Sequence, residues 1–406
     1  MSARPATRDP LALLDDYDFE LPPSSIAQTP SPERDDARLL VVGRPSGARL
    51  GGDRDVRVRD LPDWLAPGDL LVVNATRVVP ARLVGRKSSG GLAEVLLLGR
   101  AKIAASIEAS RDATATIEER PGAVHGYRAL LKCTGRVRPG LALRLGRKEA
   151  VPARVVAVHD RGEVTLAIPD DVDPYAHGEA PLPPYIRRGP RASDAPSPAA
   201  DPPGADADPD RDLERYQTIY AREPGAIAAP TAGLHLTPRV FERLRERGVD
   251  RAEVVLHVGP GTFRPLDAEA LERGRLHHEV FELPESTVAA IDATRRRGGR
   301  IVAVGTTTTR VLESCVDASG RLVAGRGETD LFLRPGGAPF RVVDALLTNF
   351  HLPRSSLLLL VAAFLGRDAT LAAYRHAVAA GYRFYSYGDA MLILPADGRA
   401  TPGDAS

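Results

Sequence analysis

Short apolar runs alternate with helix-forming segments through the second half of the chain, and this alternation restricts the possible folds more than any other feature. Strand-length apolar runs occupy residues 301–304 and 342–347, and helices are expected over 238–247, 284–297 and 369–380. Continuous apolar runs of this length are typical of strands that are buried on both faces. Strands that alternate with helices form a sheet that the helices cover. The pattern predicts an α/β fold.

Residues 82–181 have a different character, because turn signals such as Gly90-Gly91 and Pro139-Gly140 separate short strand-like runs there. This punctuation is typical of a small β-barrel or sandwich rather than of a strand–helix–strand unit. We therefore predict a larger, discontinuous α/β domain, residues 1–81 and 182–406, with an inserted small β-barrel domain, residues 82–181.

The composition is that of a soluble cytoplasmic protein. A hydrophobic fraction of 43% can bury a core, and a charged fraction of 26% keeps the surface soluble. The longest strongly apolar run, 356–365, reads as a core strand or helix and is well short of the roughly 18 residues that cross a bilayer. Two isolated cysteines, Cys133 and Cys315, suit a reducing compartment. We expect a cytoplasmic monomer without membrane contact, in which the segment 189–210, rich in Pro, Ala, Asp and Ser, is a mobile loop.

The charge balance excludes a strongly basic nucleic-acid-binding tail, because the formal net charge is only +1. All but four of the 54 basic residues are arginine. The planar guanidinium suits phosphate and base recognition, although the codon usage of a GC-rich genome accounts for the same bias. A local basic face can still steer a polyanion, which composition alone does not show.

Polar segments with glycine interrupt or follow the apolar runs. Ligand groups in α/β proteins usually lie beyond strand ends, so these segments are candidates for a binding site. Glycine lets a ligand approach the backbone, and arginine offers a fork to a carboxylate or phosphate. The candidate binding residues in the earlier segments are Asn74, Thr76, Arg77, Tyr216, Gln217, Thr231 and Gly233. A structural turn with a surface arginine explains the segment 74–77 equally well.

The later segments offer backbone N–H groups, hydroxyls and aromatic rings. The threonine-rich segment 305–310 follows an apolar strand and opens a helix, whose N-terminal N–H groups attract a carboxylate or phosphate. No G-x-G-x-x-G or G-x-x-x-x-G-K-[ST] sequence occurs, so a dinucleotide or ATP site of those types is unsupported. The candidate binding residues here are Gly259, Gly261, Thr262, Phe263, Gly305, Thr306, Thr307, Arg310, Asn349, His351, Ser386, Tyr387, Gly388 and Asp389.

His277 and Glu279 lie two residues apart, so on a strand both would point to one face. A histidine beside a carboxylate is a plausible proton-transfer pair, since small shifts tune its pKa around neutrality. A solvated charged turn explains the same residues, because Arg273, Arg275 and His278 adjoin them.

A series of motifs follows in order over nearly the whole chain. They are YDFELP at 17–22, NATRVVPARL at 74–83, YQTIYA at 216–221, AAPTAGLHL at 228–236, LHVGPGTF at 256–263, VGTTTTRVLE at 304–313, VDALLTNFHLP at 343–353 and YRFYSYGDAML at 382–392. Together they resemble the S-adenosylmethionine:tRNA ribosyltransferase-isomerase family of the queuosine pathway. The resemblance implies a larger α/β domain that carries an inserted β-barrel.

The resemblance also implies a reaction. Family members move the ribosyl group of S-adenosylmethionine to the aminomethyl group of a 7-deazaguanine in tRNA, and isomerise it to give epoxyqueuosine. Adenine and methionine leave. The implied partners are S-adenosylmethionine, as co-substrate, and tRNA bearing 7-aminomethyl-7-deazaguanine. No metal and no further cofactor is expected, since the sulfonium is itself the activating group.

Our hypothesis assigns catalytic and binding roles to three groups of residues. The proton-transfer candidates are His235, His257, His277 and Glu279. The methionine carboxylate or a tRNA phosphate is assigned to Thr306, Thr307 and Arg310. Contacts to ribose or base edges are assigned to Asn349, His351 and Asp389, and ring stacking to Phe263 or Tyr387. Replacement of His277 or Glu279 by Ala is predicted to abolish turnover and to leave folding intact.

Two alternatives remain open at the level of sequence. One is a metal-dependent hydrolase or isomerase that uses histidines 235, 257, 277 and 351, although no H-E-x-x-H or paired-cysteine spacing supports it. The other is a non-catalytic RNA-binding relative, because Gly274 stands where family members often carry a histidine and the insert diverges between residues 99 and 127.

Overall fold

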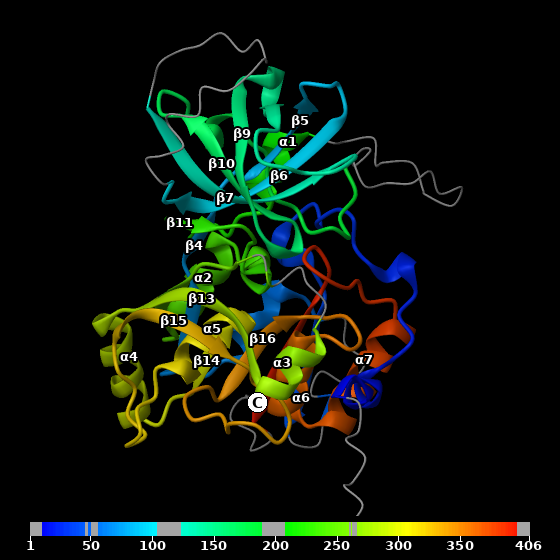
Figure 1. The fold of residues 1–406 in the computed structure, drawn as a ribbon. Coiled ribbons are helices and arrows are strands. Elements are labelled where there is room, and N and C mark those ends of the chain that lie inside the picture. Colours follow the sequence, from blue (N-terminus) through cyan, green and yellow to red (C-terminus); the bar gives the residue numbers. More distant parts are fainter. Residues whose placement is uncertain are drawn as a thin grey trace, which may run out of the picture. The chain divides into compact units, whose positions relative to one another are not determined.

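The fold is that of a computed structural model, which describes residues 10–44, 48–49, 56–103, 123–188, 208–259, 261 and 266–395. Internal contacts divide the chain into two compact units (Figure 1). One unit is formed by residues 1–77 and 217–406, and the other by residues 78–216. We call them the sheet unit and the barrel unit.

The sheet unit is built on a nine-stranded mixed sheet with the order β15-β13-β12-β3-β14-β16-β17-β1-β2. Its strands are β1 Leu39–Arg44, β2 Ala48–Arg49, β3 Leu70–Asn74, β12 Asp250–Leu256, β13 Arg275–Leu283, β14 Ile301–Val304, β15 Gly325–Leu331, β16 Ala345–Asn349 and β17 Ala390–Pro395. The four neighbours β12, β3, β14 and β16 are parallel, so their carboxyl ends meet at one edge. β17 is antiparallel to β16, so it begins at the same edge.

Both faces of this sheet are buried, as the apolar runs predict. Along β3, Leu70 and Val72 join one hydrophobic cluster, while Leu71 and Val73 join another. Because successive strand residues point to opposite faces, each cluster covers one face. The covering helices are α2 Pro238–Glu246, α3 Ala268–Arg273, α4 Glu285–Arg296, α5 Gly305–Ser314, α6 Ser356–Leu365 and α7 Arg367–Ala379 (Figure 1). The predicted α/β fold class is confirmed.

The apolar run at 356–365, which the sequence leaves open between strand and helix, forms α6. Ser355 caps it by accepting a hydrogen bond from the backbone N–H of Leu358, and Gly366 ends it with a φ of 100°. Within the described ranges no single helix is long and apolar enough to cross a membrane. The pair α6 and α7 passes that test together, but is bent by 116° at the break.

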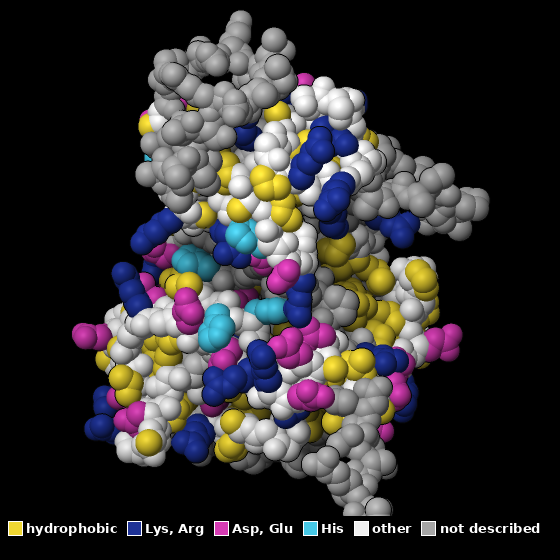
Figure 2. All heavy atoms as spheres, in the orientation of Figure 1, with side chains coloured by type: hydrophobic (Ala, Val, Ile, Leu, Met, Phe, Trp, Pro, Cys, Tyr) yellow, Lys and Arg dark blue, Asp and Glu magenta, His cyan; other side chains and the backbone are white. Residues whose placement is uncertain are grey.

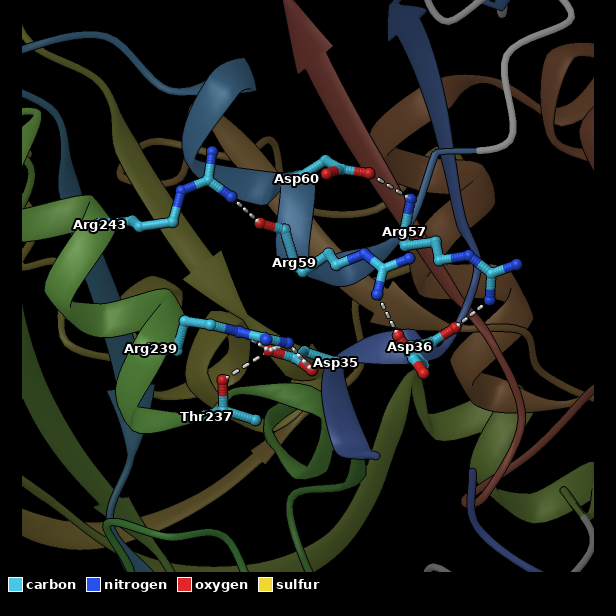
Figure 3. A network of polar contacts seen from close by, with 8 residues as sticks. All are labelled: Asp35, Asp36, Arg57, Arg59, Asp60, Thr237, Arg239 and Arg243. Atoms are coloured by element: carbon cyan, nitrogen blue, oxygen red, sulfur yellow. Dashed lines mark hydrogen bonds and ion pairs between the residues drawn. The ribbon is translucent and has the colours of Figure 1, made fainter. Parts of the chain in front are cut away.

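A polar network fastens the short 3₁₀ helices η3 Arg34–Asp36 and η4 Val58–Trp64 to α2 (Figure 3). Asp35 is buried and accepts hydrogen bonds from Thr237 Oγ1 at 2.7 Å and from Arg239 Nη2 at 2.7 Å. A buried carboxylate needs such partners, since an unpaired one is strongly destabilising. The network fixes the start of α2 and, with it, the preceding 3₁₀ helix η9 Thr231–His235.

The barrel unit contains a closed, six-stranded antiparallel barrel with the order β10-β7-β6-β5-β8-β9. Its strands are β5 Arg82–Lys87, β6 Leu92–Ala101, β7 Val124–Cys133, β8 Ala142–Leu145, β9 Val151–Val158 and β10 Glu163–Pro169. Leu83, Leu143 and Val155 are buried inward positions, and their neighbours point outward. Of the two predicted alternatives, barrel and sandwich, the barrel is the one that forms.

Contacts extend the barrel unit beyond the predicted limits of 82 and 181, to residues 78 and 216. Two ion pairs explain the extension at the C-terminal side, Arg188 Nε to Asp212 at 2.8 Å and Arg147 Nη2 to Asp210 at 2.6 Å. Both aspartates belong to α1 Pro209–Arg215, whose start is capped by Asp208. The last residues of the predicted mobile loop 189–210 therefore open a helix, and residues 189–207 lie outside the described part.

Candidate active site at the edge of the sheet

Asn74, the last residue of β3, ties three elements together at the edge where the parallel strands end. Its Nδ2 donates to Leu256 O and to Thr307 Oγ1, both at 3.1 Å, and its Oδ1 accepts from Leu256 N at 3.1 Å. Asn74 is fully buried, so each of these bonds satisfies a group that water does not reach. The side chain fixes the end of β12 and the first turn of α5 relative to β3.

His257 directly follows β12 and is half-buried beside Thr76. Its Nδ1 lies 2.8 Å from Thr76 Oγ1, and that hydroxyl also lies 3.5 Å from the carbonyl oxygen of Glu223. Burial lowers the pKa of His257, so the ring is neutral at neutral pH. When Nδ1 carries the proton and donates to Thr76, Nε2 keeps a lone pair that can accept a proton.

Glu279 forms a buried ion pair with Arg310 of α5. Glu279 Oε2 pairs with Arg310 Nη1, and Glu279 Oε1 accepts from the backbone N–H of Gly259 at 3.0 Å. Arg310 Nε also donates to Leu331 O at 3.1 Å. Only 7% of Glu279 and 6% of Arg310 are exposed, so each buried charge needs the other to compensate for its lost solvation. The pair holds the segment after β12 against α5, and Arg310 is not free to bind a carboxylate or phosphate.

His277 and Glu279 both belong to β13 but differ in exposure, since Glu279 is buried. The register of β13 against β15 is irregular between Arg275 and Glu279, within the stretch where alternation predicts one shared face. His277 is exposed, and a Cβ atom on Gly261 would lie 2.5 Å from its ring. His277 therefore borders the segment 257–261, and no hydrogen bond joins it to Glu279.

The first turn of α5 supplies the hydroxyls that the sequence singles out, but only two remain for a ligand. Thr308 Oγ1 and Thr309 Oγ1 donate to the carbonyls of Val304 and Gly305, at 2.7 and 3.1 Å. Thr307 Oγ1 accepts from Asn74, which leaves its own proton for another acceptor. Together with Thr306, it lies at the positive end of a ten-residue helix.

Asn349, the last residue of β16, joins η9 to the same edge. Its Oδ1 accepts from Thr231 Oγ1 at 2.8 Å, and its Nδ2 donates to His235 Nε2 at 3.1 Å. Burial, reinforced by the positive charge of Arg383, lowers the pKa of His235 to about 4. His235 is therefore a neutral acceptor whose Nε2 is already occupied.

The remaining C-terminal candidates are engaged in local structure. His351 Nε2 lies 2.9 Å from Thr348 Oγ1, and burial lowers the pKa of His351 to about 3. Asp389 accepts from the backbone N–H groups of Arg38, at 3.0 Å, and of Arg383, at 2.8 Å. Ser386 and Tyr387 are buried, and a Cβ atom on Gly388 would lie 2.4 Å from the carbonyl oxygen of Arg383.

The other candidates are dispersed. Arg77 is exposed, Tyr216 is buried within the barrel unit, and the carbonyl of Gln217 accepts from Arg34 Nη1 at 2.8 Å. Thr262 and Phe263 lie outside the described residues.

Two residues that the sequence does not single out approach the edge. A Cβ atom on Gly233 would lie 1.9 Å from Tyr220 Oη, so a larger residue at position 233 would force the Tyr220 ring to move. Arg34 donates to Leu234 O at 3.1 Å as well as to Gln217 O. Tyr220 belongs to the YQTIYA motif, and the family resemblance also includes Pro32-Glu33-Arg34, so the motif series is the sequence signal that contains both residues.

Polar side chains cluster on the surface around this edge. Figure 2 shows histidine, basic and acidic side chains close together on the face that carries β13. Among the residues that the structure describes, no group of three or more His, Cys, Asp or Glu side chains is placed to hold a metal ion. Gly274 is the left-handed residue that ends α3, with a φ of 63°.

Comparisons with known proteins agree with the motif series. The family model described as "Queuosine biosynthesis protein" matches residues 14–393. A protein of Thermus thermophilus named S-adenosylmethionine:tRNA ribosyltransferase-isomerase is 47% identical over 94% of this chain and 99% of its own length. One of Sorangium cellulosum with the same name is 46% identical over 94% and 98%. A crystal structure of S-adenosylmethionine tRNA ribosyltransferase from Thermotoga maritima is 34% identical, covers 93% of this chain and 100% of that one, and has a TM-score of 0.48. The chain therefore belongs to the queuosine biosynthesis protein family.

Proposed function

We propose that this chain transfers and isomerises the ribosyl group of S-adenosylmethionine onto 7-aminomethyl-7-deazaguanine in tRNA. The products are epoxyqueuosine in tRNA, adenine and methionine. The observation that carries the proposal is the identity of 47% over 94% of the chain with a relative named for this ribosyl transfer and isomerisation. The edge of the sheet supports it with polar groups held in place by buried partners.

His257 is the best placed general base. The positive sulfonium of S-adenosylmethionine acidifies the adjacent 5′ carbon, and a neutral imidazole can remove that proton. The lowered pKa keeps His257 neutral, and the contact of its Nδ1 with Thr76 fixes the ring. His235 is less suitable, because Asn349 already donates to its Nε2. Glu279 is less suitable, because Gly259 and Arg310 occupy its two oxygens.

The start of α5 suits the methionine carboxylate. Thr306 and Thr307 offer hydroxyls beside the positive end of the helix dipole. Gly305 has a φ of 87°, a conformation that favours glycine, and a Cβ atom there would be in ordinary contact with Ala232 of η9, at 3.6 Å. η9 therefore lies beside the helix start, and we place the ribose near Thr231 and Asn349. S-adenosylmethionine acts as co-substrate, and the reaction proceeds without a further cofactor in a monomer.

The test is incubation of the purified protein with S-adenosylmethionine and tRNA that carries 7-aminomethyl-7-deazaguanine. Nucleosides and small products are then analysed by mass. Epoxyqueuosine with equal amounts of adenine and methionine is expected. Bound tRNA without any product would instead favour the non-catalytic RNA-binding relative.

The base is tested with His257→Gln, which is expected to lower kcat by about 10²–10⁴-fold, the usual contribution of a general base. The matched control is His278→Gln, an exposed histidine of β13, which is expected to leave kcat unchanged. His277→Gln separates the two remaining candidates. A loss of turnover in His277→Gln but not in His257→Gln would assign the base to His277.

A further inference from the structure

Three arginines form a row on the outer face of the barrel unit. The antiparallel register places Arg86 of β5 directly opposite Arg144 of β8. Arg144 lies opposite Pro152 of β9, so Arg154 is its diagonal neighbour on the same face. All three arginines are exposed, whereas the inward residues between them are buried.

The row is poorly neutralised compared with Arg82 and Arg188 of the same unit. Arg82 pairs with Glu94 at 2.9 Å and with Glu179 at 3.0 Å, and Arg188 pairs with Asp212 at 2.8 Å. By contrast, the guanidinium groups of Arg144 and Arg154 make no ion pair or hydrogen bond with the residues that the structure describes.

The third arginine of the row has only weak partners. Arg86 donates to Gly90 O at 3.0 Å and lies 3.9 Å from Glu149, and both members of that ion pair are about half exposed. Like charges directly opposite on paired strands destabilise a sheet. Repulsion between Arg86 and Arg144 therefore destabilises the barrel, and an anion bound between them would relieve this repulsion.

We propose that this row, Arg86, Arg144 and Arg154, binds the phosphate backbone of the tRNA substrate. The three residues lie on adjacent strands, which are about 4.8 Å apart, so their positions form a line across the sheet. A line of charges suits a chain of phosphates better than a single small anion. Guanidinium groups bind phosphate in a bidentate manner and release counterions from the nucleic acid. Basic side chains are also visible near β5 in Figure 2.

This inference rests on the proposed function, because it takes tRNA as the polyanion. The experiment measures binding of unmodified tRNA transcript by fluorescence anisotropy over a range of salt concentrations. The variant carries Arg86→Ala, Arg144→Ala and Arg154→Ala together. Its affinity is expected to fall about tenfold or more at low salt, and its salt slope to become shallower by about one for each phosphate that the protein no longer neutralises.

The matched control removes the same charge elsewhere. Arg245→Ala, Arg296→Ala and Arg375→Ala combine exposed arginines of α2, α4 and α7 in the sheet unit. This variant is expected to keep both the affinity and the salt slope. The single variant Glu149→Gln removes the acid beside Arg86 and is expected to bind tRNA more tightly.

Each outcome decides the inference. Equal losses in the two triple variants, unchanged binding in the barrel variant, or no binding of tRNA by the unaltered protein would overturn it. Failure of the proposed function is separable, because the unaltered protein would then bind tRNA with the expected salt slope but make no epoxyqueuosine. If both hold, the barrel variant raises KM for tRNA and leaves kcat unchanged.

Discussion

The edge of the sheet and the outer face of the barrel hold their polar residues in opposite ways. At the edge, Asn74, Glu279 and Asn349 are buried, and each side chain serves two or more partners. On the barrel, Arg144 and Arg154 are exposed and have no partner in the described ranges. A buried group left unpaired loses its full solvation, whereas an exposed charge remains solvated. Substitutions at the edge should therefore affect stability and geometry, and substitutions on the barrel should affect only charge.

The largest effect is expected from Arg310→Met. The change leaves Glu279 buried without its partner, which costs about 3–5 kcal/mol of unfolding free energy. Because Glu279, which also accepts from Gly259, then loses its link to α5, turnover should also fall. Urea unfolding and steady-state kinetics measure the two effects. Glu279→Ala leaves the buried Arg310 without its carboxylate in the same way, so this variant should also be destabilised, contrary to the prediction from sequence that folding stays intact.

The control for this prediction is an exposed ion pair of the same unit. Arg321→Met breaks the contact with Asp317 at 3.4 Å, where 82% of the arginine side chain is exposed. Exposed pairs contribute about 0–1 kcal/mol. Equal destabilisation by Arg310→Met and Arg321→Met would show that burial does not make the first ion pair more important for stability than the second.

Asn74→Ala is expected to be the next most severe. It removes the donors and the acceptor that join β3 to Leu256 and Thr307, and buried groups left without partners cost about 1–3 kcal/mol each. We expect about 2–3 kcal/mol of destabilisation and at least a tenfold loss of kcat/KM, because the start of α5 loses its anchor. Asn74→Asp keeps an acceptor for Leu256 N but places a buried carboxylate oxygen against Leu256 O, so at pH 7 it should be at least as destabilising as Asn74→Ala. A clearly more stable Asn74→Asp would mean that the acceptor bond to Leu256 N is the important one.

The buried histidines make the stability of the sheet unit depend on pH. The pKa is about 4 for His235 and about 3 for His351, against 6.5 for an unperturbed histidine. At a pH between the folded-state pKa and 6.5, each histidine binds a proton in the unfolded chain but not in the folded chain. The unfolding free energy therefore falls as the pH falls below 6.5. Each histidine should contribute a loss of about 2 kcal/mol between pH 7 and pH 5.

His351→Gln tests this dependence. The variant should be less stable at pH 7, because a buried ring and its bond to Thr348 are lost. Its unfolding free energy should nevertheless fall less steeply between pH 7 and pH 5, by about 2 kcal/mol. A slope equal to that of the unaltered protein would show that His351 is protonated in the folded state.

The smallest effect on stability is expected from Arg144→Ala. The side chain is exposed and faces Arg86 across the strand pair, so its removal relieves repulsion. The unfolding free energy should stay within about 0.5 kcal/mol of the original or rise slightly. A loss above about 1 kcal/mol would mean that Arg144 packs against the barrel and would remove the contrast between the two regions.

Much of the fold could be predicted from local sequence. Continuous apolar runs identify β3 and β14, and caps and glycines mark the ends of α2 and α4 within one or two residues. These signals are local because periodicity and capping involve residues a few positions apart. The boundary of the barrel unit is harder to predict from the sequence. It depends on ion pairs between residues far apart in the sequence, such as Arg147 and Asp210.

The candidate site was predicted as a collection of segments, and the segments that end β3, β12, β14 and β16 do meet at one edge. Their detailed roles could not be predicted. The alternation rule pairs His277 with Glu279, but the carboxylate oxygens of Glu279 are engaged by Arg310 and by the backbone N–H of Gly259. Arg310 was expected to face a ligand, yet it is held by a carboxylate 31 residues away in the sequence.

By itself the sequence determined the fold class, the inserted barrel and the family, because apolar periodicity, turn residues and ordered motifs are properties of the linear chain. Only the tertiary structure decided that Asn349 meets His235, 114 residues apart, and that Arg86 faces Arg144. The physical reason is that strand order and register select the partners of buried polar groups and of outward charges. Neither follows from local propensity.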